Sequence, residues 1–161
     1  MAALESIRAP WTGGAYSERA RHALHDNAAS VLDRLSQFDE LAAQLDRAHA
    51  APVVTHGEPH PGNLIRTSTG LRLIDWDTVA LAEPERDLWM LDDAQESYTE
   101  ATGHPVDAAA MEFYALAWTL FDIASFADMF RREHERTRWA EQKWTGFLAL
   151  LEGGRSRPYG S

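Results

Sequence analysis

Residues 53–77 combine the side-chain types that phosphoryl transfer requires, at the spacing that this chemistry uses. The segment Val53-Val-Thr-His-Gly-Glu-Pro-His-Pro-Gly-Asn63 places a His two residues before a carboxylate, Glu58, and an Asn five residues after it. In such a site the carboxylate receives the proton of the acceptor hydroxyl, and the Asn binds a metal ion. The apolar run Leu71-Arg-Leu-Ile74 then leads into Asp75, where a second carboxylate would hold the magnesium that bridges the nucleotide phosphates. The two motifs in register predict half of a phosphotransferase site.

Each residue type has a role in this prediction. Glu58 is the candidate base or hydroxyl-orienting residue, and His56 belongs to the catalytic loop as a residue that braces it by hydrogen bonding. Asn63 and Asp75 are candidate magnesium ligands because a hard cation prefers amide and carboxylate oxygens, and Asp77 is a further ligand or a supporting acceptor. The alternative is that Asn63 is an ordinary turn residue and that Asp75 and Asp77 only mark the end of a strand. The joint spacing with His56 and Glu58 disfavours this alternative.

The pair of segments HGEPHPGN and LIDWD resembles the catalytic and metal segments of the aminoglycoside phosphotransferase family, kin of choline and homoserine kinases. The resemblance is strong over residues 53–91 and looser over 107–151. It implies a protein-kinase-like fold, ATP and Mg²⁺ as cofactors, and an activity of the kind that confers antibiotic resistance. In the family the loop carboxylate is normally Asp, so Glu58 departs from the pattern by one methylene, and a misplacement of about 1 Å can cost roughly a hundredfold in rate.

The segment after the metal Asp also resembles the family, which implies that Arg86 and Asp87 tie the loop to the next helix as a structural ion pair. Further acids lie on the predicted helices and would meet a substrate ammonium if those helices face the cleft. They are Asp92, Asp93, Glu96 and Asp122. The alternative is an ordinary solvated acidic surface.

Composition limits the partners and the location. The net charge of -10 argues against a nucleic-acid partner, because such proteins need basic faces, and it favours a small cationic acceptor. The chain contains no run of about 18 apolar residues and no signal pattern, so the sequence predicts no membrane partner and a cytoplasmic location. The absence of cysteine agrees with a reducing compartment.

The hydrophobic pattern predicts an α+β fold that is mostly α-helical, with a small β hairpin carrying the catalytic and metal segments. One domain spans residues 1–154, and a disordered tail follows over 155–161. Within the domain, 17–48 is an amphipathic helix with a break near Asp26-Asn27, 53–77 holds the site, and 86–151 is a helical subdomain. The first helix of this subdomain is expected over 86–102, with Gly103 as its stop. A long helix is expected to begin after a cap at Asp107, and a last helix over 135–151. The aromatic residues of the last two helices are expected in the core.

A complete enzyme of this kind also needs a Gly-rich loop over the phosphates and a strand lysine. The chain has one lysine, Lys143, in the pattern of the last helix, and the residues before the catalytic loop read mainly as helix. The sequence therefore predicts a truncated, C-terminal lobe of a kinase-like fold, with the N-terminal nucleotide lobe absent. Its partner would be a separate N-lobe or a second copy of the chain. The sequence does not decide whether the isolated chain binds ATP or turns it over.

Two other functions compete. One is a non-catalytic binding or dimerisation module that retains the fold and uses the apolar surface that an N-lobe would cover. The other is a metal-dependent hydrolase that uses His56, Glu58, His60 and an Asp, although the prolines of the loop prevent the helical HExxH geometry.

Overall fold

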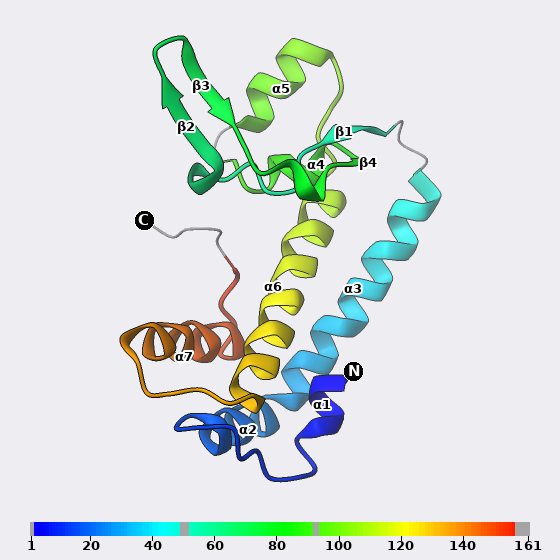
Figure 1. The fold of residues 1–161 in the computed structure, drawn as a ribbon. Helices are drawn as coiled ribbons and strands as arrows, with labels where there is room; N and C mark the ends of the chain where they lie inside the picture. The colour runs from blue at the N-terminus through cyan, green and yellow to red at the C-terminus, as the bar shows by residue number, and fades with distance from the viewer. Residues whose placement is uncertain (1, 49–51, 92–93, 157–161) are drawn as a thin grey trace. The chain divides into compact units, whose positions relative to one another are not determined.

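The computed structural model describes residues 2–48, 52–91 and 94–156 and is mostly helical, with two small antiparallel sheets (Figure 1). The chain divides into two compact units. In the described residues, the helical unit comprises 2–38 and 116–156, and the loop unit comprises 39–48, 52–91 and 94–115. The single domain over 1–154 stays a prediction.

The helical unit is built from α1 (Ala2–Ser6), α2 (Ser17–Asp26), the first part of α3 (Ala28–Ala48), the last part of α6 (Ala108–Arg131) and α7 (Arg138–Leu151). The break predicted near Asn27 is confirmed, because both its backbone N–H and its side-chain amide donate to the Ala23 carbonyl and end α2. The last helix begins later than predicted, since Thr137 Oγ1 accepts the Ala140 N–H at 3.1 Å and caps it. The sequence did not predict α1.

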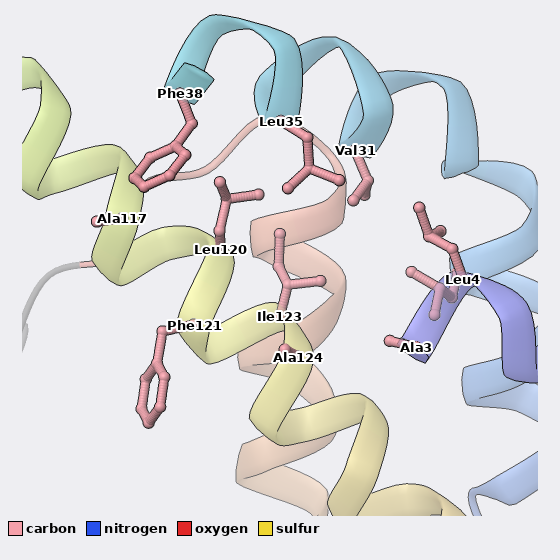
Figure 2. Close-up of a pocket in the computed structure, with 11 residues that line it drawn as sticks. Ala3, Leu4, Val31, Leu35, Phe38, Ala117, Leu120, Phe121, Ile123 and Ala124 are labelled. Atoms are coloured by element: carbon pink, nitrogen blue, oxygen red, sulfur yellow. The ribbon is translucent and has the colours of Figure 1, made fainter. Parts of the chain in front are cut away.

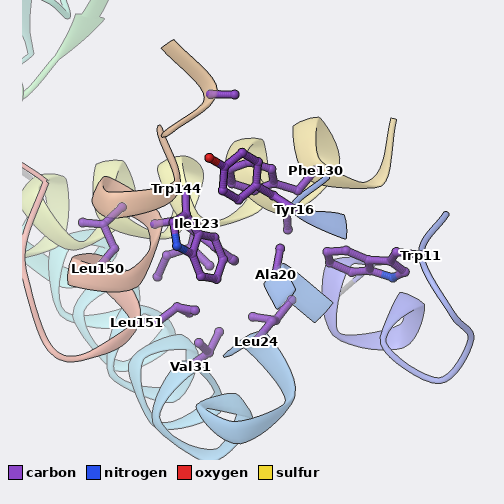
Figure 3. Packing of buried hydrophobic residues seen from close by; sticks show 13 residues of the cluster. Trp11, Tyr16, Ala20, Leu24, Val31, Ile123, Phe130, Trp144, Leu150 and Leu151 are labelled. Carbon is purple, nitrogen blue, oxygen red and sulfur yellow. The ribbon is translucent and has the colours of Figure 1, made fainter. Parts of the chain in front are cut away.

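Aromatic side chains form the centre of the helical unit (Figure 3). Phe130 of α6 and Phe147 of α7 are fully buried, with ring centroids 5.8 Å apart, and Trp144 packs against both. This confirms the predicted aromatic core for these positions. The prediction is wrong for Phe121 and Trp139, which are 64% and 57% exposed because they lie on the outer faces of their helices.

An apolar cavity of about 290 Å³ lies within the helical unit, between α1, α3 and α6 (Figure 2). Leu4, Val31, Leu35 and Ile123 line it, whereas the ring of Phe121 points away from the other lining side chains. The cavity opens to solvent, since Phe121, one of its lining residues, is 64% exposed.

Helix α6 is, in the part of the chain that the structure describes, the one helix long and apolar enough to cross a membrane by length and composition. The core helix of a globular domain satisfies the same two criteria. Ile123, Ala127 and Phe130 of this helix are buried in the centre of the helical unit, and 28% of the apolar span is buried in the described structure.

The C-terminal end of the helical unit is ordered as far as Ser156, which the sequence analysis placed in the tail. Ser156 is 6% exposed, its N–H donates to Thr119 Oγ1 at 3.2 Å and its hydroxyl donates to Asp122 Oδ2 at 2.5 Å. Residues 157–161 lie outside the described residues.

Glu18, on the first turn of α2, provides a test of the helical unit. The Arg21 guanidinium, followed by the Trp11 N–H, holds the pKa of Glu18 at about 2, below its ordinary 4.5. Because the folded pKa is depressed, these contacts stabilise the fold above pH 4.5, and the stabilisation is lost as pH falls from 4.5 towards 2. We expect Arg21→Ala to raise the midpoint towards 4.5 in an NMR titration of the Glu18 carboxyl. An unchanged midpoint would contradict this.

The loop unit holds two two-stranded sheets. Strand β1 (Val53–Thr55) pairs antiparallel with β4 (Ala80–Ala82), and β2 (Leu64–Thr67) pairs antiparallel with β3 (Gly70–Leu73). The β2–β3 hairpin agrees with the prediction. The sequence did not predict β4, because an Ala-Leu-Ala run carries no strand pattern of its own and its partner lies far upstream.

Two helices and the ends of two others complete the loop unit. Helix α4 (Glu85–Leu88) is a single turn, and α5 (Ala94–Thr102) is followed by Gly103 with φ +74°, which ends it as predicted. The predicted continuous helix over 86–102 is wrong. After Leu88 the backbone changes to i→i−3 bonds, from the N–H of Met90 and of Leu91, and the helix does not continue.

Candidate functional site

The loop predicted to be catalytic begins at His56, and the carboxylate of Asp87 fixes its start. Asp87 Oδ2 accepts the His56 N–H at 2.7 Å, and Oδ1 accepts the Gly57 N–H at 2.6 Å. The ring of His56 is buried and bridges two backbone groups: Nε2 donates to the Ile74 carbonyl at 2.8 Å, and Nδ1 accepts the Glu58 N–H at 3.2 Å. This network assigns the ring proton to Nε2. His56 therefore braces the loop, with both ring nitrogens engaged by backbone groups.

Arg86 ties the end of β1 to the 3-10 turn Trp76–Thr78, which precedes β4. Its Nη1 donates to Thr55 Oγ1 and its Nη2 donates to the Thr78 carbonyl, both at 2.8 Å, while Thr78 Oγ1 donates to the His56 carbonyl at 2.7 Å. In the described residues Arg86 and Asp87 do not form the ion pair that the sequence predicted, because consecutive helical side chains point about 100° apart. Each supports a different part of the loop. Thr55 and Thr78 were not predicted, because the sequence marks them only by their nearness to the motif.

Asn63 joins the catalytic segment to the metal segment. Its side-chain Nδ2 donates to the Glu58 carbonyl at 2.9 Å, and its own carbonyl accepts the Ile74 N–H at 2.9 Å. The second bond extends the β2–β3 ladder by one pair beyond Leu64 and Leu73. Glu58, Asn63 and the residue before Asp75 are therefore neighbours at the base of the hairpin.

Asp75 stands in a conformation that is unusual for its residue type. Its φ of +65° and ψ of 62° are left-handed, and it is the one non-glycine residue with positive φ in the described part of the chain. Such conformations cost about 1–3 kcal/mol and gather at functional sites. The carboxylates of Asp75 and of Asp77, on the following 3-10 turn Trp76–Thr78, are exposed and accept no hydrogen bond from the described residues. Glu58 is partly exposed, with Oε2 3.8 Å from His60 Nε2.

The residue types suit magnesium. The Asn63 amide and the Asp75 and Asp77 carboxylates would offer only oxygen ligands, and the Asn63 amide nitrogen donates to the Glu58 carbonyl. Magnesium is typically held by one or two protein ligands, waters and substrate phosphates. Among the described residues no group of three or more His, Cys, Asp or Glu side chains could hold a metal. Both ring nitrogens of His56, one of the residues of the hydrolase alternative, are also engaged with the backbone.

Two further acidic candidates lie in the described part of the chain. Glu96 is exposed on α5, and Asp122 belongs to the helical unit, where it accepts the Ser156 hydroxyl. Asp92 and Asp93 lie outside the described residues. The one lysine, Lys143, is on α7, with its Nζ 5.4 Å from the centre of the Phe126 ring.

Because the Asp87 carboxylate accepts two backbone N–H groups, we expect Asp87→Asn to lower the stability of the fold strongly. The amide would keep one acceptor oxygen and place its NH₂ group against a backbone N–H. Each hydrogen bond to a charged group is worth about 1.5–3 kcal/mol, so we expect a loss of roughly 3 kcal/mol in urea unfolding. Hydrogen exchange at the amides of His56 and Gly57 should also rise. The matched control is Asp77→Asn, at an exposed carboxylate, which should change stability by less than about 0.5 kcal/mol.

Gly57 and Gly70 form a second matched pair, since both have positive φ, at +96° and +118°. A Cβ at position 57 would lie 2.4 Å from Arg86 Nη2 and 2.6 Å from Thr78 Oγ1, whereas one at position 70 would meet nothing within 4 Å. Gly70→Ala should therefore cost only backbone strain, about 1–2 kcal/mol, and Gly57→Ala that strain plus a clash, roughly 3–5 kcal/mol in total. Equal losses in urea unfolding would show that the loop is not packed as described.

Solved structures of a kinase-like phosphotransferase share this architecture. The structure of the spectinomycin phosphotransferase APH(9)-Ia with AMP matches with a TM-score of 0.66, and that of the same enzyme with ADP and spectinomycin with 0.67. Each is 17% identical in sequence, and each match covers 94% of this chain and 53% of the other. The fold is thus part of a kinase-like phosphotransferase fold.

Sequence comparison defines the family. Residues 2–118 match the APH phosphotransferase enzyme family, and the chain belongs to it. Protein StrN of Streptomyces griseus is 35% identical over 100 residues, which are 62% of this chain and 30% of StrN. The chain therefore spans about half the length of the solved relatives and less than a third of StrN.

Proposed function

We propose that this chain is the C-terminal lobe of a phosphotransferase that moves the γ-phosphate of ATP to a hydroxyl group of a small cationic acceptor. One observation carries the proposal: Asn63 binds the Glu58 carbonyl with its side chain and the Ile74 N–H with its backbone. These two bonds bring the hydroxyl-accepting segment and the metal segment together.

In the proposed reaction the acceptor oxygen attacks the γ-phosphorus, the bond from that phosphorus to the bridging oxygen of ADP breaks, and Glu58 takes the hydroxyl proton. Asn63, Asp75 and Asp77 would hold Mg²⁺, which neutralises charge on the phosphates when bound. His56 and Asp87 keep the loop backbone in place, so that the Glu58 carboxylate is presented at one position.

The net charge of the chain and the ligands bound by a relative support the choice of acceptor and nucleotide. A net charge of -10 favours a cationic acceptor, and one relative has been solved with spectinomycin and ADP. The phosphate-binding lysine of such enzymes stands on a strand, whereas Lys143 is on α7. A nucleotide lobe from outside these 161 residues would supply it.

The test is Mg²⁺-dependent transfer of labelled phosphate from ATP to a panel of aminocyclitols and amino alcohols. The chain would be assayed alone and with nucleotide lobes encoded next to it. Transfer that needs both Mg²⁺ and a hydroxyl-bearing acceptor supports the proposal. No transfer in any combination, with a folded chain, contradicts it.

A second candidate is a dimerisation module without catalysis, and the surface of the loop unit favours it. Large apolar side chains are exposed along residues 53–81: Val53, Val54, Leu64, Ile65, Leu71, Ile74, Trp76, Val79 and Leu81. Val54 and Leu81 are opposite each other across β1 and β4 and are about 70% exposed, at 68% and 70%. Exposed apolar patches mark interfaces. Light scattering decides this, since a monomer at all concentrations removes the second candidate.

A further inference from the structure

A second cavity lies within the loop unit and involves none of the residues proposed for phosphoryl transfer. Its volume is about 260 Å³. Glu83 and Glu85, on either side of Pro84, form one wall, and Tyr98 of α5 and Ala110 of α6 contribute to the others. We propose that this cavity binds a small organic cation, an alkylammonium or guanidinium group on a compact apolar body. The proposal does not depend on the phosphotransferase function.

The carboxylate of Glu85 is the first argument. Glu85 is only 4% exposed although it lines the cavity. Its Oε1 accepts the Asp107 N–H at 2.8 Å, and in the described residues no protein group donates to Oε2. One carboxylate oxygen of Glu85 thus has no protein donor among the described residues, and a cation bound in the cavity would pair with it.

The surrounding charge is the second argument. Glu83 accepts the Tyr114 hydroxyl, and burial together with this bond and the nearby carboxylates raises the pKa of Tyr114 above its usual value. The guanidinium of the neighbouring residue Arg86 is directed to Thr55 and the Thr78 carbonyl. The carboxylates of Glu83 and Glu85 therefore form no salt bridge in the part of the chain that the structure describes.

The remaining lining suits the rest of such a molecule. The ring of Tyr98 offers an aromatic face, on which a cation gains about 0.5–2 kcal/mol. Leu45, Val53 and Pro105 add apolar surface. At roughly 30 Å³ for each water the space holds about nine water molecules, which limits the occupant to a small molecule. His104 and Asp107 also line the cavity and are exposed.

The test uses the full chain and two probes of similar shape, benzylammonium and neutral benzyl alcohol, titrated at neutral pH and fixed ionic strength. Binding is followed by NMR shifts of the amides of Val53, Tyr98 and Ala110. We expect benzylammonium to bind at least about tenfold more tightly than the alcohol, with shifts confined to the cavity. Equal affinities, or shifts spread over the acidic surface, would overturn the proposal.

Substitutions distinguish binding of benzylammonium in the cavity from its nonspecific attraction to an acidic protein. Glu83→Gln and Glu85→Gln should each weaken benzylammonium binding by about tenfold, and Gln at position 85 can still accept the Asp107 N–H. Glu100→Gln changes the charge equally at an exposed position of α5 and should leave the affinity unchanged. If a Glu variant fails to fold, Tyr98→Leu, which changes no charge, should weaken binding by several-fold. Equal effects of Glu83→Gln and Glu100→Gln would also overturn the proposal.

Discussion

Glu58→Gln is expected to lower phosphoryl transfer by about 10²–10⁴-fold in the assembly that turns ATP over, because the amide cannot take the hydroxyl proton. Glu58→Asp keeps a carboxylate and is the family's usual residue at this place in the motif. It moves the carboxylate by about 1 Å and should change the rate by no more than roughly a hundredfold. The rates would be measured as transfer of labelled phosphate from ATP at saturating Mg²⁺.

The control for this pair is the fold of the loop. The Glu58 backbone N–H donates to His56 Nδ1 and the Glu58 carbonyl accepts from Asn63, so neither substitution removes a bond that braces the loop. Both variants should therefore unfold at the same urea concentration as the native chain. A Gln variant that transfers phosphate as fast as the native chain would remove Glu58 from the mechanism.

Asp75→Asn should cost about 10²–10³-fold in transfer while leaving the fold intact. Asp75 is exposed and accepts no hydrogen bond among the described residues, so its carboxylate has no structural role there. Its left-handed backbone, with φ of +65°, suits Asn as well as Asp, which makes this substitution free of added strain. The loss should therefore report the metal alone.

A readout without turnover supports this assignment. Mn²⁺, which takes the same oxygen ligands, should broaden the NMR signal of the Asn63 side-chain amide in the native chain and much less in Asp75→Asn. The expected effect of Asp77→Asn is smaller, because Asp77 is assigned as an additional ligand. Broadening that persists unchanged in Asp75→Asn would place the ion elsewhere.

The sequence was sufficient for the site motif because the loop and the hairpin are local. The spacing of His56, Glu58 and Asn63 and the apolar run before Asp75 lie within one short segment, and the β2–β3 pairing needs only the turn between its strands. The sequence predicted Arg86 and Asp87 as an ion pair, whereas each of them binds separate groups of the loop. Which backbone group each one binds depends on how β1 and β4 pair, and three-residue strands carry too little pattern to show that.

Which side chains are buried was harder to predict from the sequence than the position of the motif. Periodicity identifies the apolar face of a helix, but it cannot show which apolar positions another element covers. Phe121 and Phe130 belong to the same helix and fit the same pattern, yet one is 64% exposed and the other fully buried. The same limit applies to Glu85, whose burial beside a cavity follows from the single turn of α4 and not from its neighbours in sequence.

The supports of the loop that begins at His56 lie close together in the sequence, so recombination outside them would leave them intact. Every bond that fixes the start of the loop, from Thr55, Thr78, Arg86 and Asp87, joins residues that lie between positions 55 and 87. Genetic recombination outside that interval would pass on the loop with all of these supports, whereas a crossover inside it would separate them. Lineages that exchange their flanking regions would thus keep this interval as one unit.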